Sequence, residues 1–235
     1  MILNRILARL DLALLAFLLA PLPIFFLMTF RPAIGLGATS LTLLGAWPAV
    51  RALRRTTAER AIGWFGAIVV IALVAAWVAV GGSGHLFAVN GDWLKHDGIF
   101  RDLSVMSWPP TYFRLDGHDV VLRYYEGYYA VPAMLTRLID NPKVWLQAWT
   151  TLGVVLVSLR MVYSVRGAGR RAMLVVAFAL FGGMDLIGWI IVNGADSITK
   201  NLQVESWNYS MWHDRLTMIQ FSGSTTLLYW VPQHA

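Results

Sequence analysis

Long apolar runs alternate with shorter polar segments along this 235-residue chain. Each complete run is close to the roughly 18–20 residues that an α-helix needs to cross a bilayer. The runs are continuously apolar, whereas the strands of a membrane barrel are alternating segments of about 10 residues. The pattern therefore predicts an all-α, polytopic transmembrane helical bundle. It has about five full spans and the start of a sixth, at residues 12–30, 33–50, 61–80, 144–165, 172–192 and 225–232.

The first two runs predict a transmembrane hairpin. Pro21 and Pro23 are expected to kink the first span. A cleavable signal peptide is the alternative for this run, but the run is longer than a usual signal core and a second one follows almost at once. The second run is the shortest of the complete ones and contains Pro48. We expect residues 1–60 to form one unit, made of this hairpin and a basic loop.

Arginines gather at the ends of the apolar runs. Four of them lie within residues 51–60, and Arg166, Arg170 and Arg171 follow the run at 144–165. Alternation of the spans puts both clusters on one side of the membrane, which the positive-inside rule identifies as cytoplasmic. Two more arginines precede the first span, so the N-terminus is expected in the cytoplasm.

Two long loops, residues 83–142 and 193–223, then lie on the opposite side. They hold ten of the thirteen acidic residues, so chemistry is expected on the non-cytoplasmic face. The net charge of +6 is compatible with nucleic acid, but the arginines cluster at span ends, which argues against a nucleic-acid partner. The chain has no cysteine, which excludes a thiolate nucleophile and Cys-ligated zinc.

The densest polar cluster follows directly on the third run, at residues 91–103. Asp92 is predicted to cap a short helix that lies on the membrane surface, with Lys95, His96 and Asp102 facing water or headgroups. Asp92 and His96 are one turn apart, so the pair suits a general base or a shared divalent cation. Lys95 suits a phosphate. An ordinary capped amphipathic helix explains the same residues equally well.

A second surface helix is predicted at residues 130–139, after a tyrosine-rich segment. The turn at residues 115–119 favours a solvated hairpin over a metal site. The tyrosines suit an aromatic belt at headgroup level. The functional alternative is sugar binding, with Tyr125 stacking on the ring and Arg123 and Glu126 as polar anchors.

Further candidates lie elsewhere in the chain. Asp185 is within a predicted span, where an acidic residue either packs in protonated form or serves a proton relay or aqueous cavity. Arg160 is close enough to a span end for its side chain to extend to the membrane surface. The second outer loop adds residues that either line a site or anchor the loop: Trp207, Trp212, His213, Asp214 and Arg215.

The layout resembles the GT-C superfamily of integral membrane glycosyltransferases, in an uncharacterised bacterial branch. The similarity covers about residues 61–235: an outward helix, a long outer loop with an early aspartate, and two surface helices. Three sequence segments support the similarity: Gly-Asp-Trp-Leu-Lys-His-Asp, Leu-Arg-Tyr-Tyr-Glu-Gly-Tyr-Tyr and Thr-Thr-Leu-Leu-Tyr-Trp-Val-Pro-Gln-His. Two features depart from the family pattern, namely the preceding hairpin and the lack of an acidic neighbour beside the aspartate.

The resemblance implies sugar transfer from a polyprenyl-phosphate donor to a glycan or lipid acceptor at the outer face of a bacterial inner membrane. Asp92 is the implied base and Asp97 the reserve. Lys95 or Arg123 is implied to hold the lipid phosphate, while His96 and Asp97 position substrate or a divalent cation. The last apolar run begins a span but does not complete it, so we expect this chain to be the N-terminal part of a longer protein.

Two other classes remain open. A transporter or channel subunit would use Asp185, with the outer loop as a gate. The concentration of charge outside the predicted spans argues against that class. A non-catalytic membrane subunit is the third alternative.

Overall fold

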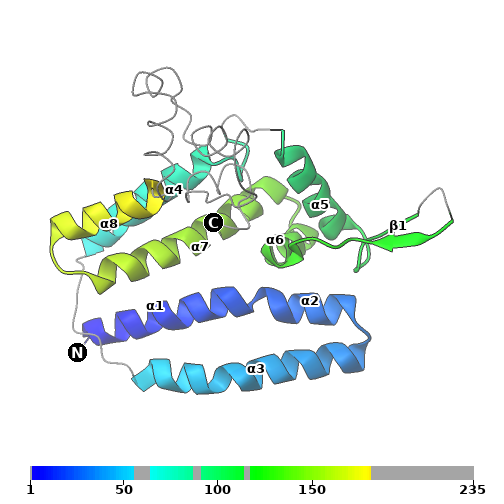
Figure 1. The fold of residues 1–235 in the computed structure, drawn as a ribbon, viewed down its shortest axis with the longest axis horizontal. Coiled ribbons are helices and arrows are strands. Elements are labelled where there is room, and N and C mark those ends of the chain that lie inside the picture. Colours follow the sequence, from blue (N-terminus) through cyan, green and yellow to red (C-terminus); the bar gives the residue numbers. More distant parts are fainter. Residues whose placement is uncertain (1, 56–63, 87–90, 114–116, 181–235) are drawn as a thin grey trace, which may run out of the picture.

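The computed structural model describes residues 2–55, 64–86, 91–113 and 117–180. Asp185, the loop at 193–223 and the last apolar run lie outside these residues. The described part is mostly helical, as predicted, and adds one two-stranded hairpin (Figure 1).

The first membrane-length segment consists of α1 (Ile2–Leu19) and α2 (Pro21–Thr29). The helix is interrupted at Ala20, because Pro21 has no backbone N–H and restricts the residue before it. The predicted kink therefore lies at this position. The apolar stretch Arg9–Thr29 across the break is 21 residues long.

Helix α3 (Pro32–Arg55) runs back along this segment and completes the predicted hairpin. A Cβ atom on Gly35 would lie 2.6 Å from the carbonyl oxygen of Phe26, so glycine permits the close approach of α2 and α3. The helix continues beyond the predicted end at Val50, with Pro48 inside it.

The second group of apolar helices comprises α4 (Trp64–Val80), α7 (Pro142–Ser164) and α8 (Ala168–Leu180). Val74 and Val78 of α4 are buried against Val155 and Leu159 of α7. Among the described residues, three helical segments are long and apolar enough to cross a membrane: Arg9–Thr29, Pro32–Leu53 and Pro142–Ser164. Helix α4 has 17 described residues and α8 has 13, so the five-span bundle stays a prediction.

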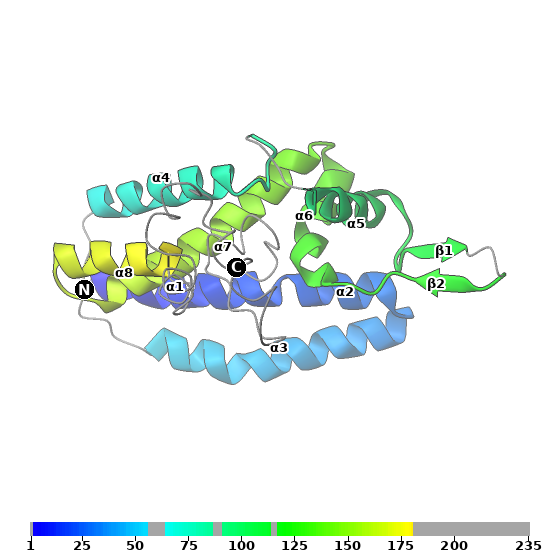
Figure 2. The same ribbon diagram turned by 45° about the horizontal axis from the view of Figure 1, so that its top comes forward.

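The polar elements lie together at one end of the molecule. They are α5 (Trp93–Val105), the strands β1 (Thr111–Phe113) and β2 (Asp119–Val121), and α6 (Glu126–Leu138) (Figures 1 and 2). The antiparallel hairpin pairs Tyr112 with Val120. The end of α3 and the α7–α8 turn lie together at the opposite end (Figure 1), as the alternation of spans predicts.

Helix α5 does not present its apolar side to the membrane, and this part of the prediction is wrong. Trp93, Phe100 and Leu103 are 1 %, 4 % and 0 % exposed. They pack against Tyr129 and other residues of α6, where Ala130 and Ala133 leave room for large side chains. The two predicted surface helices therefore form a cap with its own buried core.

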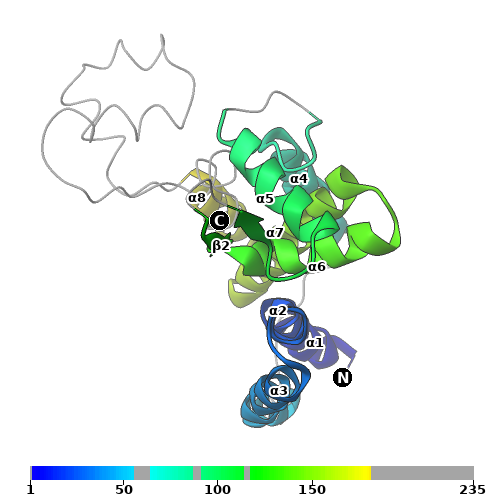
Figure 3. The same cartoon turned by 90° about the vertical axis from the view of Figure 1, so that its right-hand side faces the viewer.

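The cap contacts the first hairpin through α2. Helix α6 packs against α2, and Figure 3 shows α1, α2 and α3 as a layer beneath the remaining helices. Arg160 of α7 also contacts this layer, since its Nε atom lies 2.5 Å from Oδ1 of Asp11 on α1. The sequence did not predict this contact of Arg160 with Asp11.

Candidate functional site

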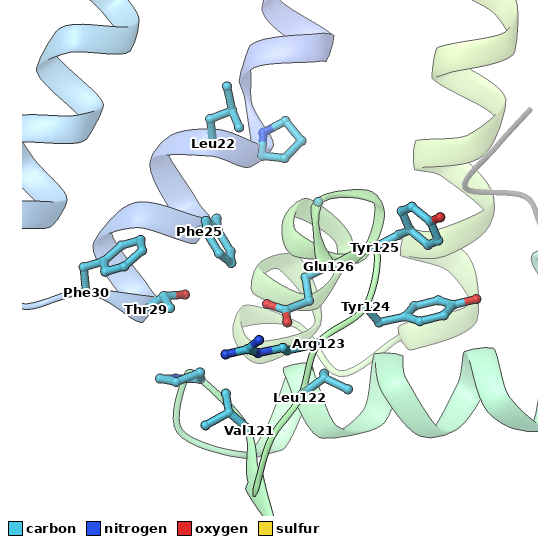
Figure 4. Close-up of a pocket in the computed structure, with 13 residues that line it drawn as sticks. Leu22, Phe25, Thr29, Phe30, Val121, Leu122, Arg123, Tyr124, Tyr125 and Glu126 are labelled. Atoms are coloured by element: carbon cyan, nitrogen blue, oxygen red, sulfur yellow. The ribbon is translucent and has the colours of Figure 1, made fainter.

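A cavity of about 830 Å³ lies between α2 and the segment that joins β2 to α6. We call it the α2–α6 cavity (Figure 4). The wall formed by α2 and the residue after it is almost wholly apolar, with Leu22, Phe25 and Phe30. The opposite wall carries Arg123 and Glu126. The cavity thus joins the apolar surface of a membrane-length segment to a pair of charged side chains.

Arg123 and Glu126 lie side by side on the cavity wall, facing α2 (Figure 4). Arg123 is exposed, whereas Glu126 is only 8 % exposed in the first turn of α6. Burial raises the pKa of the Glu126 carboxyl above its ordinary value of 4.5, and a hydrogen bond with the backbone of Tyr124 offsets part of the shift. Glu126 therefore keeps its proton to a higher pH than an exposed glutamate.

Thr29 contributes a hydroxyl to the opposite side of the same cavity. Its Oγ1 atom is buried and has no hydrogen-bond partner within the described part of the chain. Buried polar atoms are normally paired, so such an atom in a cavity wall is a natural contact for a ligand. Sequence patterns give no sign of it, because an isolated threonine in an apolar run is common.

The tyrosines after Arg123 have different environments. Tyr125 is 56 % exposed and lines the α2–α6 cavity, with its ring directed away from α2 (Figure 4). Tyr129 is fully buried, and the hydroxyl of Tyr128 lies 2.5 Å from Oγ1 of Thr150 on α7. Tyr128 and Tyr129 thus fix α6 in place, a role that neither the aromatic-belt nor the sugar-stacking interpretation predicted.

Three of the predicted site residues lie at the start of α5, namely Asp92, Lys95 and His96. Asp92 is half-buried immediately before the helix, and its side chain makes no capping hydrogen bond. The Nζ atom of Lys95 lies 5.6 Å from the ring centroid of Tyr124, which lines the α2–α6 cavity. Lys95 is exposed and does not itself line that cavity.

His96 does not face water or headgroups, and that prediction is wrong. Its side chain is 0 % exposed, and Nδ1 lies 2.5 Å from the hydroxyl oxygen of Tyr129. The cause is the packing of α5 on α6, which encloses the side of the helix that holds Trp93 and His96. His96 lies at the centre of the cap.

Asp97 forms a contact that the sequence did not predict. Its Oδ1 atom lies 3.1 Å from Nε2 of His85, in the turn after α4. Both residues line a separate cavity of about 390 Å³, which we call the His85 cavity. His85 has a backbone φ of +54°, a conformation that costs most residues about 1–2 kcal/mol. The available sequence signal was its place directly after residues 81–84, a Gly-rich turn.

A second contact fixes the hairpin to α5. The hydroxyl of Tyr112 donates a hydrogen bond to Oδ2 of Asp102, at 2.6 Å. Burial and this bond raise the pKa of Tyr112 to about 12. Asp102 thus holds the hairpin, and the predicted turn at its tip includes the exposed residues His118 and Asp119.

The structure therefore divides the predicted site into three parts. Arg123, Tyr125 and Glu126 share the α2–α6 cavity, and Asp97 lines the His85 cavity. Asp92, Lys95 and His96 lie along the start of α5. In the segments that the structure describes, no three His, Asp or Glu side chains are grouped closely enough to hold a metal ion.

Protein-family models, curated proteins and solved structures gave no match to this chain. Asp185 and the candidates of the second outer loop lie outside the described residues.

Proposed function

We propose that this chain is the membrane core of a glycosyltransferase. It takes a sugar from a polyprenyl-phosphate donor and transfers it to a glycan or lipid acceptor at the non-cytoplasmic face of a bacterial inner membrane. In this proposal the cap faces outward and the arginine-rich end faces the cytoplasm. The observation that carries the proposal is the α2–α6 cavity, where an apolar membrane-segment wall meets Arg123 and Glu126.

The cavity suits a lipid phosphate because its two walls match the two parts of such a molecule. Leu22, Phe25 and Phe30 provide apolar contacts for the first isoprene units. The Arg123 guanidinium is a planar donor that pairs with phosphate oxygens. Lys95 beside Tyr124 supplies a second positive charge within the cap.

Burial raises the pKa of the Glu126 carboxyl, which extends the pH range of its neutral form and so lessens its repulsion of an anion. A protonated carboxyl donates a hydrogen bond to a phosphate oxygen, whereas a carboxylate repels it. The Thr29 hydroxyl, which is unpaired within the described part of the chain, is a further donor in the same cavity. Arg123, Glu126 and Thr29 together supply donors for a phosphodiester.

Asp92 is the proposed base. Asp97 contacts His85 and lines the His85 cavity, whereas Asp92 lies half-buried immediately before α5, at the same end of the helix as Lys95. In the transfer, the acceptor oxygen forms a bond to C1 of the sugar and the bond from C1 to the phosphate oxygen breaks. The electron pair leaves with the polyprenyl phosphate, and the acceptor proton moves to Asp92.

Photoaffinity labelling tests the donor site. Full-length protein in liposomes is exposed to a photoreactive polyprenyl-phosphate mannose, with photoreactive polyprenol as the uncharged comparison. We expect Arg123→Gln to reduce labelling by the phosphate probe about tenfold or more, because a lost charged hydrogen bond costs about 1.5–3 kcal/mol. Labelling by polyprenol is expected to stay the same.

Arg31→Gln is the matched control, because Arg31 is an exposed arginine at the α2–α3 turn and does not line the cavity. Asp92→Asn is expected to keep the labelling and to abolish sugar transfer, measured by mass spectrometry of glycans and glycolipids in cells that carry the variant. Equal labelling of wild type and Arg123→Gln would exclude the donor site. An unchanged glycan and glycolipid profile in Asp92→Asn would remove Asp92 as the base.

A further inference from the structure

The His85 cavity lies on a different side of the cap from the α2–α6 cavity. Phe100 and Leu146 of the buried cap core line the His85 cavity. Phe25, Leu122 and Tyr124, which pack on the same core, line the α2–α6 cavity instead. The core therefore separates the two cavities, and a ligand in one does not occupy the other.

The wall of the His85 cavity contains both hydrogen-bond donor and hydrogen-bond acceptor side chains. It combines cations, carboxylates, hydroxyls and an imidazole: His85, Asp97, Arg101, Ser104, Thr136, Asp140 and Lys143. A neighbouring hollow of about 500 Å³ shares His85 and Lys143 with it, so the groove continues past the imidazole.

His85 is held firmly in this wall. The hydroxyl of Ser83 donates to Oε1 of Gln147 at 2.5 Å, which ties the turn to α7. The His85 ring also meets Trp93 edge-on, at a centroid distance of 5.5 Å. A left-handed backbone conformation at a non-glycine residue persists only where the surroundings impose it, and such residues concentrate at ligand sites.

The contact with Asp97 sets the chemistry of the imidazole. Asp97 engages Nε2, which in the neutral ring is then the protonated nitrogen. The other nitrogen, Nδ1, is then the hydrogen-bond acceptor of the ring. The pair thus places an imidazole with one acceptor nitrogen in the wall of the His85 cavity.

The mixture of donors, acceptors and apolar side chains in this wall limits the class of ligand that it can bind. Phe100, Val105 and Leu146 add an apolar part to the wall, and the carboxylates of Asp97 and Asp140 oppose a simple anion. A neutral polyol matches both donors and acceptors, and the volume accommodates one sugar ring. We propose that the His85 cavity binds a neutral sugar unit, one of whose hydroxyls donates a hydrogen bond to Nδ1 of His85. This site does not depend on the lipid-phosphate site.

Ligand-observed NMR tests the site directly. Full-length protein in nanodiscs, free of sugar-headed detergent, is titrated with methyl glycosides of glucose, mannose, galactose and N-acetylglucosamine. At least one glycoside is expected to bind. His85→Ala and Asp97→Ala are expected to weaken that binding by about tenfold or more. Asp97→Asn, whose amide oxygen still accepts from Nε2, is expected to bind within about threefold of wild type.

A second measurement needs no variant of the site. Diethylpyrocarbonate modifies accessible histidines, and peptide mass spectrometry reports His85 separately from the other histidines. The bound glycoside is expected to protect His85 and to leave the exposed His118 reactive. Failure of every glycoside to bind, or equal protection by inorganic phosphate, would overturn the proposal.

The two proposed sites are distinguished by testing the variant of each site in the binding assay of the other. Arg123→Gln is expected to keep glycoside binding, and His85→Ala is expected to keep labelling by the polyprenyl-phosphate probe. Loss of glycoside binding in Arg123→Gln would contradict separate sites. Glycoside binding in a protein that does not bind the phosphate probe would leave the sugar site intact and reject only the donor site.

Discussion

Nδ1 of His96 lies 2.5 Å from the hydroxyl oxygen of Tyr129, and both side chains are 0 % exposed. This hydrogen bond joins α5 to α6 at the centre of the cap. Burial raises the pKa of Tyr129, so the phenol stays neutral at physiological pH. Tyr129→Phe is expected to destabilise the protein by about 1–3 kcal/mol, because it removes a partner from a buried imidazole.

Thermal unfolding of the full-length protein in nanodiscs measures this effect. Tyr125→Phe is the matched control, since Tyr125 is exposed in the same segment and the change is expected within about 0.5 kcal/mol. A Tyr129→Phe protein as stable as the control would show that the bond contributes little to the cap.

The ion pair between Asp11 and Arg160 is expected to hold α1 against α7. Its atoms are 2.5 Å apart, with the Asp11 side chain 16 % exposed and that of Arg160 42 % exposed. Asp11→Asn is expected to cost about 1–3 kcal/mol, between the values for exposed and buried pairs. The double variant Asp11→Asn with Arg160→Gln is expected to lose less than the sum of the two single changes. Additive losses would contradict a direct interaction.

Gly153 is expected to permit the close packing of α7 against α1. A Cβ atom there would lie 2.6 Å from the ring of Phe17, which itself stacks on Trp149 at 4.1 Å. Gly153→Ala is therefore expected to destabilise the protein by about 1–3 kcal/mol. Gly45→Ala in α3, where a Cβ meets nothing within 4 Å, is the control and is expected to be neutral or slightly stabilising. Thermal unfolding of both variants compares them, and equal stability would argue against close α1–α7 packing.

The sequence predicted the helices and the order of polar and apolar segments, because span length and proline positions are local properties. The helix after Asp92 and the break at Pro21 follow from such signals. Which side of α5 is buried depends on a partner 33 residues away, since His96 meets Tyr129. An amphipathic pattern alone does not distinguish a lipid surface from a helix such as α6, so the exposure of His96 was predicted wrongly.

In the candidate site, too, the residues of one short segment could be predicted, and the contacts between distant segments could not. The sequence selected Arg123, Tyr125 and Glu126 from one short segment, and they line one cavity. Thr29 and His85 were missed because each contributes through contacts or cavities formed by distant elements. The spacing of residues along the chain does not show which elements distant in the sequence pack together, so it could not predict the cavities that Thr29 and His85 line.

Glu126 is expected to make stability depend on pH in a defined direction. Its pKa is raised in the folded protein by burial, from an ordinary value of 4.5, and it lies outside the membrane-length helices. The folded state therefore holds this proton to a higher pH than the unfolded chain does. The free energy of unfolding then falls as pH rises from about 4.5 through the raised pKa, and is constant again above it.

Glu126→Gln removes the titration and keeps the shape of the neutral carboxyl. Unfolding of wild type and variant in nanodiscs between about pH 4 and pH 8 isolates the contribution, because the other titrating groups are common to both. We expect wild type to lose stability relative to Glu126→Gln as pH rises. The same comparison with Asp119→Asn, on the exposed hairpin, controls for a general loss of negative charge. Labelling by the polyprenyl-phosphate probe should follow the same curve, falling with pH in wild type and staying level in Glu126→Gln, because a phosphodiester does not titrate in this range. Parallel curves for the two proteins would mean that Glu126 does not carry its proton into the folded cavity.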